Sequence, residues 1–137
     1  NQTGVKAYPN PVFRGRNETE NVPFVTTFTG STFTLLPGSR VVPLMALGEG
    51  TLLMYPLKSQ EQSLSTPRGP GAGTLQGGVL QFGKGRVAII AEASWCSAQI
   101  AGYISPGFKM GMNNTKSAPY NVQFALNLVH WLTGLID

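Results

Sequence analysis

A short segment with a glycine turn between two apolar runs constrains the fold of this chain more than any other. The segment is VLQFGKGRVAIIAE, residues 79–92, and its glycines flank Lys84. Apolar runs of this length on both sides of a glycine turn are typical of a β-hairpin. The run 87–91 shows no alternation of polar and apolar residues, which indicates a strand buried on both faces. We therefore expect a hairpin at 83–85 and a buried strand near 86–92, with helices on both faces of the sheet.

The C-terminal segment PYNVQFALNLVHWLTG, residues 119–134, predicts a helix near 119–133. Ser117 is a candidate N-cap, Pro119 suits the first turn, and Gly134 is a natural C-terminal stop. Apolar residues occupy most of the helix circumference, and the polar residues form one narrow stripe of Gln123, Asn127 and His130. A helix with so little polar surface is expected to be mostly buried against the sheet.

Three further segments predict strands, and one long segment predicts a loop. Residues 22–36 alternate apolar residues with threonine, which indicates one or two strands broken at a glycine. Short apolar runs at 41–48 and 51–57 are expected to pair as a hairpin through the glycine turn at 48–50. The segment 58–78 is rich in Gly, Pro and Ser, which is typical of a long flexible loop. With the hairpin and the helix, these elements predict an α/β fold with a mixed sheet.

Composition and charge exclude several classes of protein. The 137 residues suit a single domain, of which 42% of the residues are hydrophobic and only 12% are charged. The net charge is +4, but the basic residues are scattered and form no clustered face of the kind that binds nucleic acid. The chain has no run of about 18 apolar residues, so we expect no membrane span. One cysteine and one histidine leave no credible soft-metal site, and we expect no metal or cofactor.

Three Asn-x-Ser/Thr triplets begin at Asn1, Asn17 and Asn113. Each is an acceptor for N-linked glycan in a secreted protein, although chance matches to so short a motif are common. The chain starts with Asn1 instead of Met, as expected of a processed product or a piece of a longer chain. We interpret the triplets as indicating an extracellular or periplasmic protein, and a cytoplasmic location stays open.

Four segments of the chain resemble the class I glutamine amidotransferase-like proteins. The segments 83–95 (GKGRVAIIAEASW) and 121–134 (NVQFALNLVHWLTG) resemble the last strand and the final helix of these domains. The segment 10–17 (NPVFRGRN) resembles a His-Pro-Ile and glycine segment of the family, with Asn10 where histidine is usual. The segment 24–31 (FVTTFTGS) looks like part of uncharacterised bacterial members, and the likeness extends to proteins of the trehalose-utilisation type.

This resemblance implies a flavodoxin-like α/β sandwich that is longer than the present chain. The chain would then correspond to the second half of such a domain, without the strand and turn that carry the family's nucleophile. Active members place a histidine just beyond the strand that corresponds to 87–91. Here the sequence continues Glu92-Ala93-Ser94-Trp95, without a histidine. The resemblance therefore implies a degenerate domain in which no residue is assigned as catalytic.

Glu92 is the main candidate for ligand contact, because ligands of α/β proteins bind beyond the carboxyl ends of strands. Its carboxylate can accept hydrogen bonds from a sugar, and Ser94, Trp95 and Gln99 are expected to share the same rim. Trp95 can stack on a sugar ring, whereas burial in the core is the commoner outcome for tryptophan. The structural alternative for Glu92 is a carboxylate bound to nearby backbone N–H groups or to an arginine, which would hold the turn at 93–100.

The single cysteine and the single histidine are expected to have structural roles. Cys96 has no histidine near it in sequence to activate the thiol, so we expect a buried free thiol. His130 is expected to lie partly buried in the helix, bonded to Asn127 or to the backbone.

These observations favour a non-catalytic binding or assembly domain. If the first half of the fold is absent, one edge of the sheet is open, and open edges require cover. The expected partner is another protein chain, a second copy added strand to strand, or a missing segment of the same protein, and a glycan is a further candidate. Two alternatives stay open. One is a hydrolase of carbohydrate or amide substrates with Glu92 as base, and the other is a sugar or small-molecule binding module in which Trp95 contacts the ligand.

Overall fold

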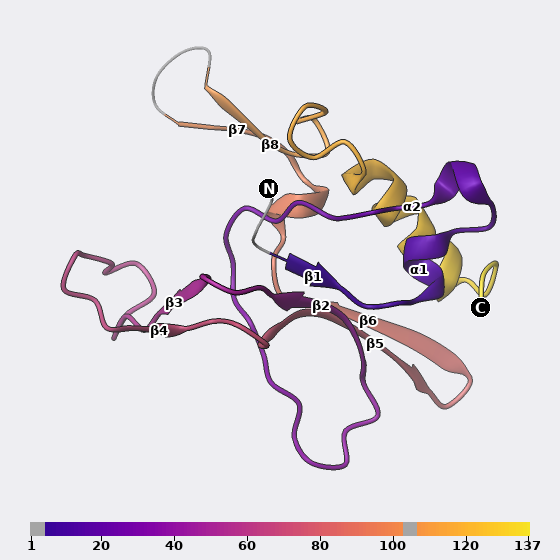
Figure 1. The fold of residues 1–137 in the computed structure, drawn as a ribbon, viewed down its shortest axis with the longest axis horizontal. Coiled ribbons are helices and arrows are strands. Elements are labelled where there is room, and N and C mark those ends of the chain that lie inside the picture. The colour runs from indigo at the N-terminus through magenta and orange to yellow at the C-terminus, as the bar shows by residue number, and fades with distance from the viewer. Residues whose placement is uncertain (1–4, 103–106) are drawn as a thin grey trace.

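The computed structural model describes residues 5–102 and 107–137, with a four-stranded sheet at its centre (Figure 1). The strands lie in the order β1-β2-β5-β6. Their bounds are Val5–Ala7 for β1, Val42–Leu47 for β2, Leu75–Phe82 for β5 and Gly85–Ile90 for β6. All strand pairings among the described residues are antiparallel, so the prediction of a mixed sheet was wrong for these strands.

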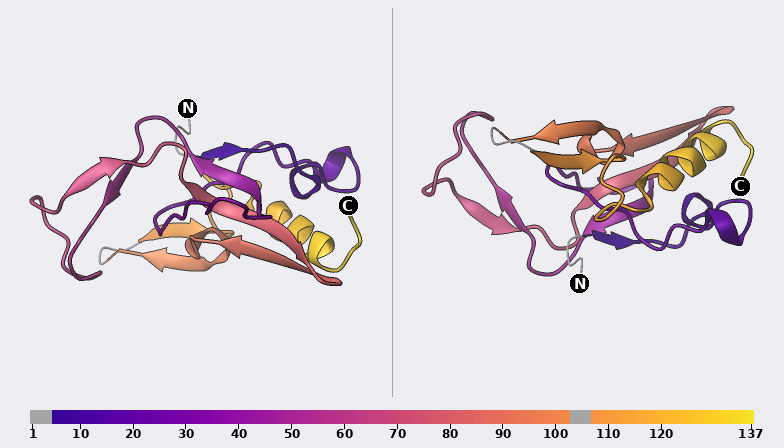
Figure 2. Two further views of the ribbon diagram at one scale, coloured as in Figure 1. Left: turned by 90° about the horizontal axis from the view of Figure 1, so that it is seen from below. Right: turned by 90° about the horizontal axis from the view of Figure 1, so that it is seen from above.

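Two small ribbons project from this α/β structure, and one long helix packs on the sheet. The ribbons pair β3, Leu52–Met54, with β4, Arg68–Pro70, and β7, Ala98–Ala101, with β8, Phe108–Gly111. The helices are α1, Pro11–Arg14, and α2, Asn121–Leu132, and the 3-10 turns are η1, Glu18–Glu20, and η2, Ser94–Cys96. Figure 1 shows both ribbons on the side away from the turn of the β5–β6 hairpin. The views in Figure 2 place α2 between α1 and that hairpin.

The β5–β6 hairpin is confirmed at the position predicted from the glycine turn. Phe82 pairs with Gly85 across a two-residue turn, whose glycine has a φ of 58°, in the left-handed region. The burial of β6 differs from the prediction, because β6 is an edge strand of the sheet. Val87 and Ile89 are 39% and 40% exposed, since α2 packs on the other face only. The prediction of a strand near 86–92 that is buried on both faces, between helices, was therefore wrong.

The buried strands of the sheet are β2 and β5. Leu44 and Met45 of β2 are fully buried, and so, almost completely, are Leu75 and Val79 of β5. The core joins these strands to α1, η2 and α2 through Val12, Phe13, Val22, Val25, Leu44, Met45, Val79, Trp95, Phe124, Leu128, Trp131 and Ile136. Apolar burial on this scale is the main source of stability in a domain of this size.

The strand predicted at 41–48 is confirmed as β2, and the strand predicted at 51–57 is shortened to β3. The turn at 48–50 follows β2 without closing a hairpin, because β2 pairs with β1 and β5 whereas β3 pairs with β4. The hairpin prediction for this turn was therefore wrong. The segment 58–78, expected to be a long flexible loop, contains β4 and the start of β5.

The segment 22–36, predicted to form one or two strands, contains no regular strand. It makes one isolated bridge, between Phe33 and Leu75. Part of its backbone binds a side chain of α2 instead, since Thr26 N donates to Asn121 Oδ1 at 3.0 Å and Thr26 O accepts from Asn121 Nδ2 at 2.8 Å. The strand prediction was wrong because these backbone groups find a buried side chain as their partner in place of a neighbouring strand.

The C-terminal helix is confirmed as α2, and it ends as the sequence predicts. Gly134 N donates to Trp131 O at 3.1 Å, and Leu135 N donates to His130 O at 2.8 Å. These two bonds form a Schellman motif, in which the glycine takes a left-handed φ of 80°. The N-cap predicted at Ser117 was wrong, because the helix begins later in the chain and has no side-chain cap.

The burial of α2 matches the prediction only in part: Phe124, Leu128 and Trp131 are buried, but one residue of the polar stripe is buried as well and other apolar residues are exposed. Asn127 belongs to the predicted polar stripe, yet it is fully buried. Its Nδ2 donates to Val12 O and to Glu20 O, both at 2.9 Å. The exposed apolar side chains of the helix, which we name the α2 apolar flank, are Val122, Leu126, Val129 and Leu132, each between 39% and 55% exposed. A helix expected to be mostly buried therefore shows a long apolar surface.

Candidate functional site

Glu92 lies just after β6, and backbone N–H groups occupy its carboxylate. The side chain is buried, with 3% of the residue exposed. Its Oε1 accepts from Ser94 N at 2.6 Å, and its Oε2 accepts from Trp95 N at 3.0 Å and from Phe28 N at 3.4 Å. The carboxylate thus holds the turn η2 and connects it to the segment 22–36. This geometry corresponds to the structural alternative for Glu92.

Gly30 allows the main chain to cross directly over this carboxylate. A Cβ atom at Gly30 would lie 2.6 Å from Glu92 Cγ and 2.9 Å from Ala91 O, and the φ of 122° is one that side chains rarely adopt. The next residue, Ser31, donates its N–H to Ala91 O at 2.9 Å. The protein's own backbone therefore fills the space beside Glu92.

The other residues predicted to share the rim differ in their exposure. Trp95 is buried, and its ring meets Phe124 edge to face with the centroids 5.1 Å apart. Ser94 is half-buried and gives its N–H to the Glu92 carboxylate, whereas Gln99 is exposed on β7. The structure thus brings Glu92, Ser94 and Trp95 together, but the tryptophan presents no open face on which a sugar ring could stack.

Cys96 is exposed, which contradicts the buried thiol expected from the sequence. Its Sγ donates to Ala93 O at 3.4 Å, and Trp95 takes the buried position of η2 in its place. His130 is half-buried, and its buried Nδ1 has no hydrogen-bond partner within the described residues. The predicted bond to Asn127 does not form, because that amide is occupied by two backbone carbonyls and by a glutamine side chain.

Two of the three candidate glycosylation sites can be compared, because Asn1 lies outside the described residues. Asn17 is exposed, and its Oδ1 accepts from Thr19 N at 3.0 Å and from Thr19 Oγ1 at 2.6 Å. Asn113 is half-buried, its Nδ2 donates to Gln99 O at 3.1 Å, and its Oδ1 is buried without a partner in the described structure. Asn17 is therefore the more accessible acceptor.

An ion pair between Arg16 and Glu20 stabilises the loop beside α2. Glu20 Oε2 accepts from Arg16 N at 2.9 Å, and Arg16 Nε donates to the two carboxylate oxygens at 2.8 and 3.1 Å. Hydrogen bonds from Arg16 lower the pKa of Glu20 to about 2, and the charge of His130 acts in the same direction. Both oxygens of the Glu20 carboxylate are therefore engaged, whereas the Arg16 side chain stays half exposed.

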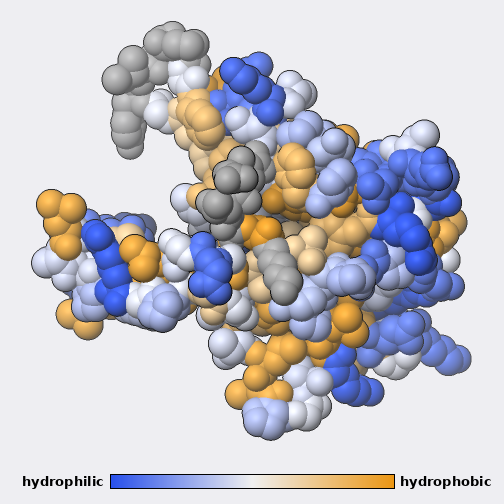
Figure 3. All heavy atoms as spheres, viewed as in Figure 1, coloured by the Kyte–Doolittle hydropathy of each residue, from blue (hydrophilic) through white to orange (hydrophobic). Residues whose placement is uncertain are grey.

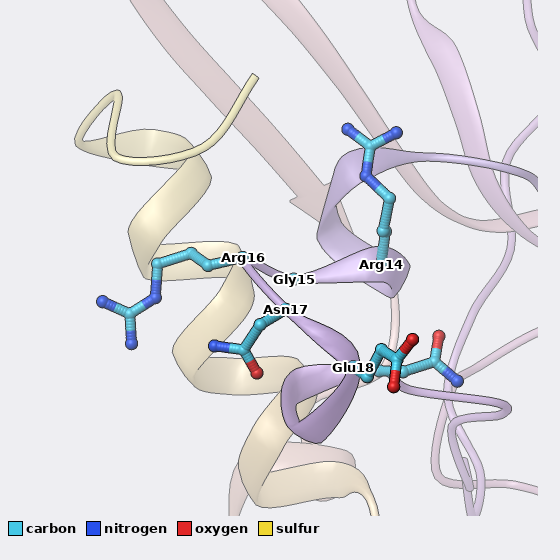
Figure 4. Close-up of a pocket in the computed structure, with 6 residues that line it drawn as sticks. Arg14, Gly15, Arg16, Asn17 and Glu18 are labelled. Carbon is cyan, nitrogen blue, oxygen red and sulfur yellow. The ribbon is translucent and has the colours of Figure 1, made fainter.

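A cavity of about 370 Å³ beside this pair is lined by Arg14, Gly15, Arg16, Asn17, Glu18 and Asn21. Figure 4 shows that the side chains of Arg14, Arg16 and Glu18 point in three different directions. The guanidinium of Arg14 donates to Asp137 O at 3.2 Å. A ligand site needs polar groups that converge on the ligand, and this cavity does not have them.

A second, apolar groove of about 450 Å³ lies between the loop 33–41 and Ile89 of β6. Leu36 in this loop is exposed. Figure 3 shows apolar side chains gathered over the loop, at the bottom of the view. The groove therefore adjoins the exposed side of β6.

The β5–β6 hairpin has an apolar outer face. The register pairs Leu80 with Val87 and Gly78 with Ile89. The side chains of Leu80, Val87 and Ile89 therefore lie on the same face of the sheet, and so does that of Phe82. Phe82 is 67% exposed, and the two β6 side chains are exposed to about 40%. We name the surface formed by Leu80, Phe82, Val87 and Ile89 the outer hairpin face.

The edge of β6 beside this face presents backbone groups without a partner strand. Ala91 N donates to Gln76 O at 2.9 Å, and in an antiparallel pair every second residue bonds to the same neighbour. By this alternation, the N–H and C=O groups of Arg86, Ala88 and Ile90 point away from β5. No described strand pairs with that side of β6. The edge is therefore ready to accept an added strand.

Arg86 carries the only charge of β6, and its side chain leaves the edge free. Its Nη1 donates to Trp131 O at 2.8 Å and to Ile136 O at 2.7 Å, and its Nη2 pairs with Asp137. The guanidinium carbon also lies 5.2 Å from the centroid of the Trp131 ring. The arginine thus binds the C-terminal end of α2, where carbonyl groups carry partial negative charge. The edge consequently lacks the exposed charges with which proteins protect edge strands.

No family model, curated protein or solved structure matches this chain. Among the described residues, no three His, Cys, Asp or Glu side chains lie close enough to share a metal ion. No helix in the ranges 5–102 and 107–137 is both long and apolar enough to cross a membrane. The candidate site with the strongest geometric definition is the open edge of β6 with the outer hairpin face. Sequence reasoning expected an open sheet edge if the first half of the fold is absent, but it did not place that edge at β6, and it missed the outer hairpin face. The reason is that an unbroken run of apolar residues is expected both for a strand in the centre of a sheet and for an edge strand that binds a partner, so the sequence pattern does not distinguish the two.

Proposed function

We propose that this chain is a non-catalytic binding and assembly domain that joins a partner chain by accepting a strand at the open edge of β6. One observation carries the proposal. The outward backbone groups of Arg86, Ala88 and Ile90 have no partner strand among the described residues, and Val87 and Ile89 between them expose apolar side chains. An added strand gains N–H···O bonds from the first set and apolar contacts from the second.

The surroundings of Glu92 support a non-catalytic role. A general base must reach a proton of the substrate, whereas this carboxylate is buried and accepts three backbone hydrogen bonds. Trp95, the residue for stacking on a sugar, packs against Phe124. The hydrolase and the sugar-binding module are therefore less well supported than a strand-binding domain.

The proposal retains the resemblance of 83–95 and 121–134 to the end of amidotransferase-like domains. In this view the parent architecture is a flavodoxin-like sandwich, and an edge that lies open here is covered by a partner. The exposed triplet at Asn17 supports a location outside the cytoplasm.

Native mass spectrometry of the chain expressed in its natural source tests this function. We expect the wild-type chain in a complex heavier than its own 14.6 kDa. A variant with Val87→Lys and Ile89→Lys should appear alone, because it places two charges against the incoming strand. The control carries Leu57→Lys and Leu64→Lys, two fully exposed side chains outside the sheet, and should remain in the complex. A wild-type chain found alone would overturn the proposal.

A further inference from the structure

We infer that the strand added to β6 is the β6 of a second copy, paired antiparallel about a two-fold axis at Ala88. The inference rests on the proposed function, because it names the partner of the same edge. Two-fold dimers are the commonest closed assemblies, and they require a surface that is complementary to itself. The backbone, the side chains and the charge of β6 each meet that requirement.

The outward backbone groups of β6 are arranged symmetrically about Ala88. Arg86 and Ile90 lie two residues before and after it, and all three residues point away from β5. In an antiparallel pair centred on Ala88, the two alanines face each other, and Arg86 of each copy faces Ile90 of the other. Each facing pair then exchanges two N–H···O bonds, the pattern of a regular antiparallel ladder.

The same register pairs the exposed β-branched side chains. Val87 of each copy lies opposite Ile89 of the other, on the outer hairpin face. These are non-hydrogen-bonded pairs, in which the Cα atoms approach to about 4.5 Å and the side chains are closest. Cross-strand pairs of β-branched residues stabilise sheets, and here each of the two pairs covers a side chain that the single copy exposes.

Charge does not oppose this pairing. The only ionisable side chain of β6 is Arg86, which is bound to the end of α2 and paired with Asp137. In the proposed register the two arginines lie at opposite ends of the strand pair, separated by roughly 13 Å along the strands. The edge thus brings no like charges together.

The two-fold axis also accounts for the α2 apolar flank. Asn127 binds α1 and η1 on one side of the helix, and Val122 and Val129 lie on the opposite side. Because α2 packs beside β6, the axis places the two α2 helices on the same face of the joined sheet. Their apolar flanks then face each other across the axis. A strand pair alone is small beside a standard interface of about 1,600 Å², and the helices add the remaining contact.

A matched pair of double variants tests the register with the purified 137-residue chain. The first carries Val87→Lys and Ile89→Lys, so that like charges face each other across the axis. The second carries Val87→Glu and Ile89→Lys, so that opposite charges face each other. Both place two charged residues at positions that are already about 40% exposed, so both should unfold at similar urea concentrations.

Sedimentation equilibrium measures the dimer dissociation constant of each chain. We expect a wild-type dimer of twice 14.6 kDa, and a dimer of the two-lysine variant that is weaker by about 30-fold or more. The glutamate–lysine variant should dimerise at least about tenfold more tightly than the two-lysine variant. Equal dissociation constants for the two variants would overturn the register.

Residue-resolved amide exchange provides an independent readout. The N–H groups of Arg86, Ala88 and Ile90 should become protected as protein concentration rises. Those of Val87 and Ile89 already bond to β5 and should not change, which makes them an internal control. A wild-type chain that stays monomeric, with no such protection, would overturn the inference. The proposed function would still stand if that chain is found with a different partner in its natural source, and both would fail if it is alone there as well.

Discussion

Replacing Asn121 with leucine should remove the hydrogen bonds that connect α2 to the segment 22–36 and to the turn η2. Asn121 is fully buried at the start of α2. Its Nδ2 donates to Thr26 O at 2.8 Å and to Trp95 O at 2.9 Å, and its Oδ1 accepts from Thr26 N at 3.0 Å. Leucine has nearly the same shape but no polar atom. The substitution therefore leaves two carbonyl groups and one N–H group buried without these partners.

The magnitude follows from the cost of these three backbone groups. A buried donor or acceptor that loses its partner costs about 1–3 kcal/mol, and the lower part of that range applies where the chain can relax. Three such groups give a loss of about 3–5 kcal/mol. A domain of this length has a free energy of unfolding of roughly 7–20 kcal/mol, so the loss is a large fraction of the total. It corresponds to a fall in melting temperature of about 12–20 °C.

Urea unfolding followed by tryptophan fluorescence measures this loss, and Lys116→Ala is the control. Lys116 precedes the helix and is exposed, so its truncation should cost less than about 0.5 kcal/mol. The slope of the free energy against urea concentration should be the same for both variants, because the surface exposed on unfolding is similar. A loss below about 1 kcal/mol for Asn121→Leu would refute the reasoning, since the three bonds would then be of no consequence for stability.

Three further predictions concern charge, the end of α2 and glycosylation. The pKa of Glu20 is about 2 in the folded chain against an ordinary 4.5, so its stabilising contribution is complete above about pH 4.5 and is lost as the pH falls towards 2. Urea midpoints of Glu20→Gln should therefore vary less over this acid range than those of the wild type, whereas Glu18→Gln, at an exposed neighbour, should follow the wild type. Arg86→Met should cost about 1–3 kcal/mol in urea unfolding, because it removes hydrogen bonds to the last carbonyls of the helix region, and Lys84→Met in the exposed hairpin turn should cost almost nothing. In a eukaryotic secretory host, peptide mass spectrometry should find glycan at Asn17, with Asn17→Gln as the control, and an unmodified Asn17 would contradict its role as an acceptor.

The hairpin and the C-terminal helix were predictable because their signals are local. The turn at 83–85 needs a residue that tolerates a left-handed φ at Gly83, whatever the rest of the chain does. The end of α2 is likewise determined by Gly134, which completes a Schellman motif with bonds only to the preceding turn. Such features depend on residues that are close in sequence, and periodicity and turn chemistry capture them.

The burial of these same elements was not predictable from the pattern of apolar residues. The run 87–91 satisfies the rule for a central strand, but whether another strand lies beside it is decided by chain segments far away in sequence. In α2 the sequence indicated one narrow polar stripe on a helix that was expected to be mostly buried. Asn127 of that stripe faces inward, because the irregular backbone at Val12 and Glu20 has carbonyls that require a donor.

The candidate site was likewise predictable only where it depends on residues that are close in sequence. Glu92 was recognised as an unusual carboxylate at a strand end, and its structural alternative was stated from the sequence. The residues that occupy it include Phe28, which is distant in sequence and reaches it only because Gly30 allows the crossing. The outer hairpin face was missed, since its exposure follows from the position of β6 in the sheet and not from its composition.

The segment 22–36 and the sheet beside it differ in how firmly each is held in the fold. The sheet is held by ladders of backbone bonds, whereas this segment is held by separate contacts. They include the side chains of Asn121 and Glu92 and isolated backbone bonds to Phe13, Leu75 and Ala91. A strand in a ladder is released only when many backbone hydrogen bonds break together, whereas a separate contact is lost when one residue moves away. We therefore expect the part of the segment that follows its core residues Val22 and Val25 to detach below the free energy of global unfolding. Heat, denaturant and proteases should thus open this part of the segment before they unfold the sheet, so the two can show separate melting transitions.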